Sequence, residues 1–153
     1  MIKLGIELPD KNIKGIDLTN PKEGNPGVGG SEYLFTLLGT YLKQEAENID
    51  ICFYHYSENK LPKKGKIVTD EYEMLRQMRI DSIDIFIYQV NKTSEWYKAL
   101  RNTNLRAMAW AHVYPAYYEQ KEIIKTENIR RVVFVGKEEY DAYIDSDLIC
   151  KST

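Results

Sequence analysis

The sequence predicts an α/β fold, a Rossmann-like open parallel sheet with helices on both faces. Segments rich in β-branched and aromatic residues alternate with segments of helical periodicity along the whole chain. One segment, Arg131–Val135, is nearly all apolar, which is typical of a strand covered on both faces. A chain of 153 residues has the length of one ordinary domain, so we expect residues 1–153 to form a single Rossmann-like domain.

The first predicted strand is Ile2–Leu8, in which apolar and polar residues alternate. The segment Asp10–Gly30 carries Pro, Gly, Asn and Lys with little periodicity, so we expect a long loop with a short extended piece at Ile16–Leu18. A loop of this length in a compact domain is usually functional or mobile. Leucines and tyrosines at helical spacing then predict a helix from about Ser31 to Glu47. Ser31 is the expected N-cap, because its hydroxyl can accept a backbone N–H of the first turn.

The same alternation continues through the rest of the chain. The other expected strands are Ile49–Tyr56, Lys66–Thr69, Ile83–Tyr88, Leu105–Ala111 and Arg131–Val135. The other expected helices are Glu71–Arg79, Ser94–Arg101 with Ser94 as its cap, Tyr114–Lys125 and Lys137–Ile144. A further apolar element is expected to begin at Ile149, which suggests that the chain is a fragment of a longer protein.

The composition narrows the class of protein. Hydrophobic residues make up 43% and charged residues 29%, which is typical of a soluble globular domain. A net charge of −2 gives no electrostatic reason to expect binding to nucleic acid. The two cysteines, Cys52 and Cys150, form neither a Cys-x-x-Cys pair nor a disulfide framework, which indicates a reducing compartment. No apolar run has the pattern of a signal peptide or the length of a membrane span, so we expect a cytoplasmic protein.

The stretch Asn25–Glu32 places three glycines immediately before the predicted helix at Ser31. A glycine-rich loop that opens a helix can bind an anion, because backbone N–H groups and the helix dipole both favour negative charge. It is not a nucleotide-hydrolase phosphate loop, since it has no lysine. It also differs from the dinucleotide fingerprint, since the glycines do not directly follow the strand and Glu32 stands at the third glycine position. A flexible helix entry without a ligand is the alternative, and Glu32 would repel an adjacent phosphate.

Polar residues at the carboxyl ends of the strands are the other candidates, because ligands of open α/β sheets bind there. His112 ends an apolar strand and could donate a hydrogen bond to a sugar hydroxyl or phosphate, or act as a base. The alternative is a histidine that only holds the turn. Asn91 and Tyr114 lie at the same predicted rim. The second strand delivers His55 and Tyr56 there, and the alternative for His55, at an aromatic strand end, is a packing role. No residues have metal-ligand spacing, so no metal and no cofactor are expected.

Three motifs in this order resemble the family 4 glycosyltransferases of the GT-B architecture. The first is Gly-Val-Gly-Gly-Ser-Glu at Gly27–Glu32, after a first strand and long loop. The second, Trp110–Tyr114, is similar to that family's strand-end histidine segment, and the third, Arg131–Tyr140, to its next strand and helix. The resemblance covers nearly the whole chain. Gly136 departs from it, since the family often has serine at this position.

The resemblance implies the N-terminal, acceptor-binding domain of a retaining enzyme that transfers a sugar from a nucleotide sugar to a glycan or lipid-linked acceptor, without a metal. Gly29 and Gly30, with Ser31, would contact the donor diphosphate. His112 would contact the donor sugar near the reacting centre. The donor-binding C-terminal domain is absent from this sequence, so the chain alone would be inactive. A role in surface-glycan synthesis and peripheral contact with the inner membrane face are further implications.

Two other classes of function stay open at this stage. The first is a stand-alone, non-catalytic α/β binding or regulatory domain whose loop contacts a protein. The second is a nucleotide-dependent oxidoreductase, against which the failed dinucleotide fingerprint argues. The basic run Lys60–Lys66 could meet a lipid surface or an anionic substrate, and the alternative is a solvated turn.

Overall fold

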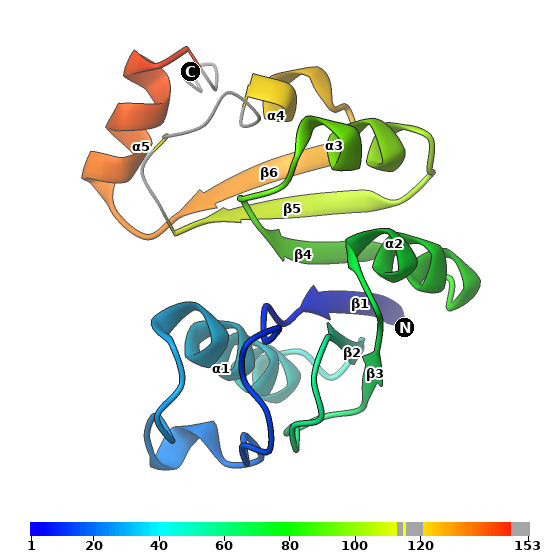
Figure 1. The fold of residues 1–153 in the computed structure, drawn as a ribbon, viewed down its shortest axis with the longest axis vertical. Coiled ribbons are helices and arrows are strands. Elements are labelled where there is room, and N and C mark those ends of the chain that lie inside the picture. Colours follow the sequence, from blue (N-terminus) through cyan, green and yellow to red (C-terminus); the bar gives the residue numbers. More distant parts are fainter. Residues whose placement is uncertain (113–114, 116–120, 148–153) are drawn as a thin grey trace. The chain divides into compact units, whose positions relative to one another are not determined.

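The computed structural model of the chain describes residues 1–112, 115 and 121–147 (Figure 1). It contains a six-stranded, all-parallel sheet with the strand order β3-β2-β1-β4-β5-β6. The predicted Rossmann-like α/β fold is therefore confirmed. In a sheet of this order, the chain reverses its direction of winding between β1 and β4, and ligands commonly bind beyond the carboxyl ends of the strands near that point.

The elements follow the predicted sequence of strands and helices. The strands are β1 (Ile2–Glu7), β2 (Ile49–His55), β3 (Gly65–Ile67), β4 (Ile85–Gln89), β5 (Arg106–Ala111) and β6 (Ile129–Phe134). The helices are η1 (Pro21–Glu23, a 3-10 turn), α1 (Gly30–Glu45), α2 (Glu71–Ile80), α3 (Ser94–Arg101), α4 (Glu122–Lys125) and α5 (Lys137–Asp145). Half of the predicted Tyr114–Lys125 helix lies outside the described residues, and α4 is its last part.

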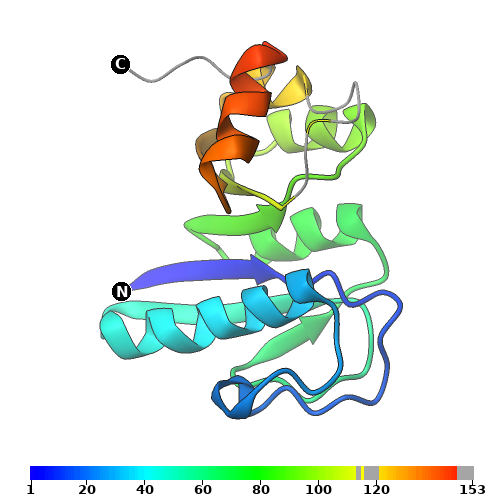
Figure 2. The same ribbon diagram turned by 90° about the vertical axis from the view of Figure 1, so that its left-hand side faces the viewer.

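The chain forms two compact units, Met1–Phe86 and Ile87–Thr153. In the first unit, α1 packs along β1 and β2 (Figure 2). Gly39 lets α1 come close to β2, because a Cβ at this position would overlap the ring of the buried Phe53. On the opposite face, a Cβ at Gly5 of β1 would lie 3.1 Å from Met78 of α2. Helices therefore cover both faces of this part of the sheet, as predicted.

The long loop after β1 is tied to the segment that follows β2. Asp17 forms an isolated parallel bridge with Lys60, which confirms the extended piece expected at Ile16–Leu18. The backbone N–H of Leu18 donates to the Lys60 carbonyl at 2.8 Å, and the Leu18 side chain is buried. At the next strand, β3 is only three residues long and carries exposed lysine at the edge of the sheet, a pattern that discourages pairing with other chains.

The second unit has an aromatic core. Tyr88 of β4 packs against Trp96 and Tyr97 of α3, with ring centroids 4.9 and 6.3 Å away. The predicted cap of α3 was wrong by one residue, because the Thr93 hydroxyl accepts the N–H of Trp96 at 3.2 Å, and Ser94 is the first helical residue.

The expectation of a strand covered on both faces was wrong for β6. Its residues are half-buried or exposed, and 40% of Val133 is accessible to solvent. The reason is its position: β6 is the last strand in the order of the described sheet, where burial depends on what lies beside the strand as well as on its sequence. An apolar run therefore identified the strand but not its environment.

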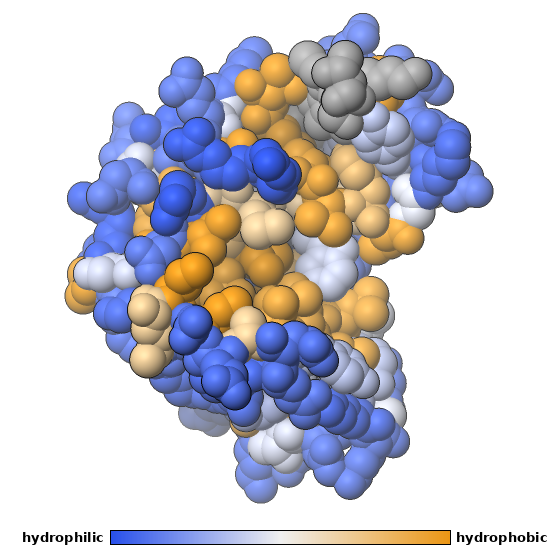
Figure 3. Space-filling view, turned by 180° about the vertical axis from the view of Figure 1, so that it is seen from behind, coloured by the Kyte–Doolittle hydropathy of each residue, from blue (hydrophilic) through white to orange (hydrophobic). Residues whose placement is uncertain are grey.

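Hydrophilic residues make up much of the molecular face shown in Figure 3, with hydrophobic residues between them. None of the helices in the described part of the chain is both long and apolar enough to cross a membrane.

Candidate functional site

The loop that leads into α1 is shaped by the side chain of Asn25. Its Oδ1 accepts the backbone N–H groups of Gly27 and Val28, both at 2.9 Å, and its Nδ2 donates to the Val28 carbonyl at 2.9 Å. Gly27 has a φ of +98°, a conformation that glycine adopts without steric cost. The side chain of Asn25 and the glycine at 27 together define the approach to the helix.

The first turn of α1 begins with glycines. Gly29 is the N-cap residue, and as a glycine it offers no side-chain oxygen to the helix. The predicted cap Ser31 was wrong, because Ser31 is the second residue of the helix itself. N–H groups of a first turn have no partner within the helix, so they can serve an anion. A Cβ added at Gly30 would meet no other atom within 4 Å, so the surface at this residue is open.

Glu32 changes the electrostatics of this helix start. Its carboxylate folds back over Gly29, where an added Cβ would overlap it. A negative charge is stabilised at a helix N-terminus, so the position suits an anionic group. The same carboxylate would compete with a phosphate there. An anionic ligand can bind at Gly29 only if the Glu32 side chain, which is flexible, turns away.

A buried polar cluster lies at the carboxyl ends of β1 and β2 and was not predicted. It consists of Asp10, His55, Tyr56 and Asn59. The fully buried Asp10 carboxylate accepts the Tyr56 backbone N–H at 2.6 Å and the Asn59 side-chain amide at 2.8 Å. The His55 Nδ1 lies 3.3 Å from the same carboxylate. A buried carboxylate is tolerated only with such partners, so this Asp10 cluster fixes the start of the long loop to β2.

A second buried carboxylate, Glu7, borders this cluster. The Tyr56 hydroxyl donates to Glu7 Oε1 at 2.8 Å. Burial, and then the negative charge of Glu7, raise the pKa of Tyr56 far above its usual value, so the phenol stays protonated and keeps this bond. His55 is buried and faces Asp10 and Gly65, which supports the packing role considered from the sequence. The rule of strand ends pointed to His55 and Tyr56, but the partners lie 45 residues or more away in sequence.

In the second unit, Asn91 and His112 lie at the ends of neighbouring strands. The Val90 N–H donates to the Trp110 carbonyl at 3.2 Å, which places the end of β4 beside the end of β5. Asn91 is exposed just after β4, and His112 directly follows β5. The predicted rim residue Tyr114 lies outside the described residues.

The environment of His112 favours the neutral imidazole. Its ring packs on Trp110, with centroids 4.8 Å apart and the planes inclined by 59°. Burial lowers the pKa of His112 below its ordinary value. At neutral pH the ring therefore has one nitrogen that can donate a hydrogen bond and one that can accept.

The lysines of the basic run mostly pair with aspartates. Lys60 lies 3.8 Å from Asp17, Lys64 lies 2.6 Å from Asp50, and Lys66 lies 2.5 Å from Asp81. These pairs partly neutralise the basic run, which argues against contact of Lys60–Lys66 with an extended lipid surface.

The candidate residues thus fall into two groups. Gly29, Gly30 and Ser31 form one helix start in the first unit, and Asn91 and His112 follow neighbouring strands in the second. Among the described residues, no group of three or more His, Cys, Asp or Glu side chains is arranged to hold a metal ion. The fold and these two groups define a Rossmann-like α/β protein with polar residues at the carboxyl ends of its strands. Comparisons with protein-family models, curated proteins and solved structures give no match to this chain.

Proposed function

We propose that the chain is the N-terminal, acceptor-binding domain of a retaining GT-B glycosyltransferase similar to family 4, acting on a nucleotide sugar and a glycan or lipid-linked acceptor. The observation that carries the proposal is the start of α1 in a Rossmann-like sheet, where a shaped glycine loop leads to a helix N-terminus that is open at Gly30. The carboxylate of Glu32 over Gly29 supports it, since the position accommodates a negative charge.

In this proposal the helix start stabilises the departing diphosphate. The N–H groups of Gly29 and Gly30, with Ser31, donate to phosphate oxygens as negative charge builds on them, and Glu32 turns away to admit them. Backbone donors that are already in position lower the activation free energy of the transfer, because they do not have to reorient during the reaction. The neutral imidazole of His112 orients the donor sugar, and Asn91 and Tyr114 contact the acceptor. The donor-binding domain belongs to the remainder of the polypeptide.

The test uses the full polypeptide encoded by the natural gene. Release of nucleoside diphosphate is measured with a panel of nucleotide sugars, for the wild type and for Gly30→Val. The open space at Gly30 means that valine should leave the fold intact, which circular dichroism and the melting temperature verify. Valine keeps the backbone N–H of residue 30, but its side chain blocks the approach of a phosphate to the helix start. We expect kcat to fall by about 10²-fold, the size of effect known when one such donor no longer reaches the developing charge. Unchanged turnover in Gly30→Val would refute the assignment of the loop.

The competing function is a stand-alone, non-catalytic α/β binding domain. The Glu32 carboxylate favours it in one respect, because it already occupies the place where a diphosphate would lie. A full natural polypeptide that neither binds nor turns over any nucleotide sugar would support this alternative.

A further inference from the structure

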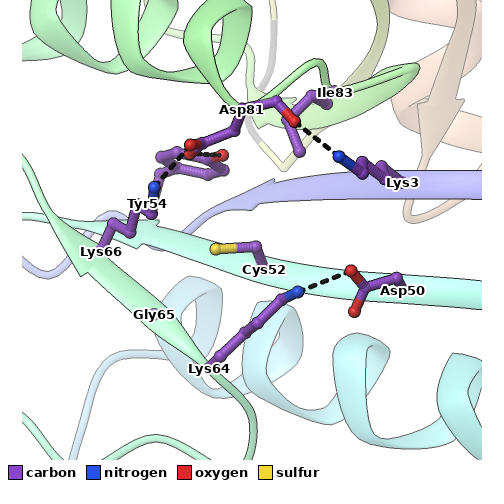
Figure 4. A pocket seen from close by; sticks show the side chains of 9 residues that line it. All are labelled: Lys3, Asp50, Cys52, Tyr54, Lys64, Gly65, Lys66, Asp81 and Ile83. Atoms are coloured by element: carbon purple, nitrogen blue, oxygen red, sulfur yellow. Dashed lines mark hydrogen bonds and ion pairs between the residues drawn. The ribbon is translucent and has the colours of Figure 1, made fainter.

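A cavity of about 210 Å³ opens on the sheet of the first unit, apart from the strand ends described above (Figure 4). Asp50, Cys52 and Tyr54 line it from alternate positions of β2, so they share one face of the strand. Asp50 lies near the amino end of β2 and Cys52 at its middle, whereas the Asp10 cluster lies at its carboxyl end. Lys3 of β1 and two lysines beside Gly65 complete the charged wall.

The floor of the cavity is formed by buried side chains, and its entrance by charged ones. Cys52 and Tyr54 are almost entirely buried, whereas the side chains of Lys64 and Lys66 are 58% and 44% exposed. In Figure 4 the thiol of Cys52 lies between the Lys64–Asp50 pair and the group formed by Lys66, Tyr54 and Asp81. A ligand would therefore meet ammonium groups as it enters.

The charges of the lining residues do not balance. Lys64 pairs with Asp50, and Lys66 pairs with Asp81. The Nζ of Lys3 instead donates to the backbone carbonyl of Asp81 at 3.1 Å, and a carbonyl is a neutral acceptor. Three ammonium groups against two carboxylates leave one positive charge at the cavity, and Lys3 is its source.

The volume and the thiol limit the class of ligand. A cavity of about 210 Å³ is smaller than the roughly 300–1,000 Å³ that accommodate drug-sized molecules. Burial raises the pKa of the Cys52 thiol, so it stays protonated and is a packing surface rather than a nucleophile. We propose that this cavity binds a compact oxyanion with the size and charge of phosphate, held by the ammonium groups of Lys3, Lys64 and Lys66. Lysine binds phosphate as a point charge, and its flexible stem lets it turn toward the ligand.

The test is a titration of the ¹⁵N-labelled chain with sodium phosphate at pH 7, with the ionic strength held constant by sodium chloride. We expect the amide signals of Cys52 and Gly65 to shift and saturate, with a dissociation constant on the order of 1 mM. Shifts that grow linearly without saturation, or that appear equally at lysines over the whole surface, would overturn the proposal.

Two variants distinguish phosphate binding in the cavity from a general attraction to surface lysines. Lys3→Gln removes the unbalanced charge and leaves both ion pairs in place, and it should weaken binding at least about tenfold. Lys43→Gln is the matched control, because the Nζ of Lys43 also donates to a backbone carbonyl, that of Ile49 at 3.0 Å, outside the cavity. Equal effects of the two variants would overturn the proposal.

The source of the oxyanion is identified with the same titration. Inorganic phosphate and glycerol 3-phosphate are compared in the same way. Tighter binding of the ester would identify a phosphorylated headgroup as the source of the oxyanion, and tighter binding of the inorganic ion would identify free phosphate.

Discussion

The helices α1 and α2 of the first unit begin in opposite ways. At α2, the Asp70 carboxylate accepts the N–H groups of Tyr72 and Glu73, both at 2.8 Å. Glu73 in turn accepts the N–H of Thr69, the residue before the cap, at 2.6 Å, which ties the preceding segment to the first turn. At α1 the N-cap is Gly29, which has no side chain. The start of α2 is satisfied by its own sequence, whereas the start of α1 is built from glycines on a loop that other residues hold in place.

This difference shows that a helix start can either be stabilised by a side-chain cap or leave its backbone accessible to a ligand. A capped helix start gains stability from its own residues. A helix start made of glycines lacks the stability of a side-chain cap, but it allows a ligand to approach the backbone closely. The position of such a start then depends on residues outside the helix, here Asn25.

The largest expected effect concerns the anchor of the long loop. Asp10→Ala should lower the free energy of unfolding by about 3 kcal/mol, because it removes the buried acceptor shared by the half-buried Tyr56 and Asn59 and leaves a void beside His55. Urea denaturation measures the change. Asp17→Ala is the control, since Asp17 lies in the same loop with an exposed side chain, and its effect should be small. If the two variants were equally stable, the loop would not depend on the cluster.

The next effect concerns the cap of α2. Asp70→Ala should lower the free energy of unfolding by about 1 kcal/mol, the usual cost of removing an aspartate N-cap. Asp70→Asn keeps an acceptor oxygen and should restore most of the loss in the same denaturation experiment. A stability equal to that of the wild type in Asp70→Ala would remove the contrast between the two helices.

The stability that His112 contributes should depend on pH between pH 7.5 and pH 5, unlike the stability that comes from the helix caps. Burial lowers its pKa in the folded chain, so the folded state binds fewer protons than the unfolded state below about pH 6.5, the ordinary histidine value. The stability from the neutral ring is present above that pH and is lost as the pH falls toward the lowered pKa. His112→Gln should therefore show a smaller loss of stability than the wild type between pH 7.5 and pH 5. Identical pH profiles would contradict the burial of the ring.

The smallest effect is expected at Ser31. Ser31 is the second residue of α1 and does not occupy the N-cap position. Ser31→Ala should therefore lower the free energy of unfolding by less than Asp70→Ala does, by about 0.5 kcal/mol. Parallel denaturation of Ser31→Ala and Asp70→Ala makes the comparison direct. A loss at Ser31 as large as that at Asp70 would mean that α1 has an internal cap after all.

The sequence predicted the elements well and their surroundings less well. Alternation and helical spacing located β1, β2 and α1 to within about two residues, because these patterns are local. The burial of β6 could not be predicted, since it depends on the neighbours of the strand in the sheet. The N-cap of α1 was placed at Ser31 because serine is the stronger capping residue, whereas the chain enters the helix two residues earlier.

In the candidate site, too, the features encoded by local sequence patterns were predicted and those formed by distant residues were not. The glycine loop and His112 were found from motifs and from the rule of strand ends. The Asp10 cluster and the phosphate-sized cavity were not, because their members come from β1, β2 and later segments that meet only in the folded chain. Local patterns carry no information on which distant side chains share a carboxylate or line the same cavity.

The most direct test of the central claim is glycine-selective ¹⁵N labelling of the full natural polypeptide, followed by addition of a nucleoside diphosphate. The account predicts saturable shifts at the amides of Gly29 and Gly30, with Gly39 in the middle of α1 as the internal control. The same spectrum contains Gly65, which reports the separate cavity. Shifts confined to Gly65, or none at Gly29 and Gly30 at saturating ligand, would contradict the claim that the start of α1 binds the donor diphosphate.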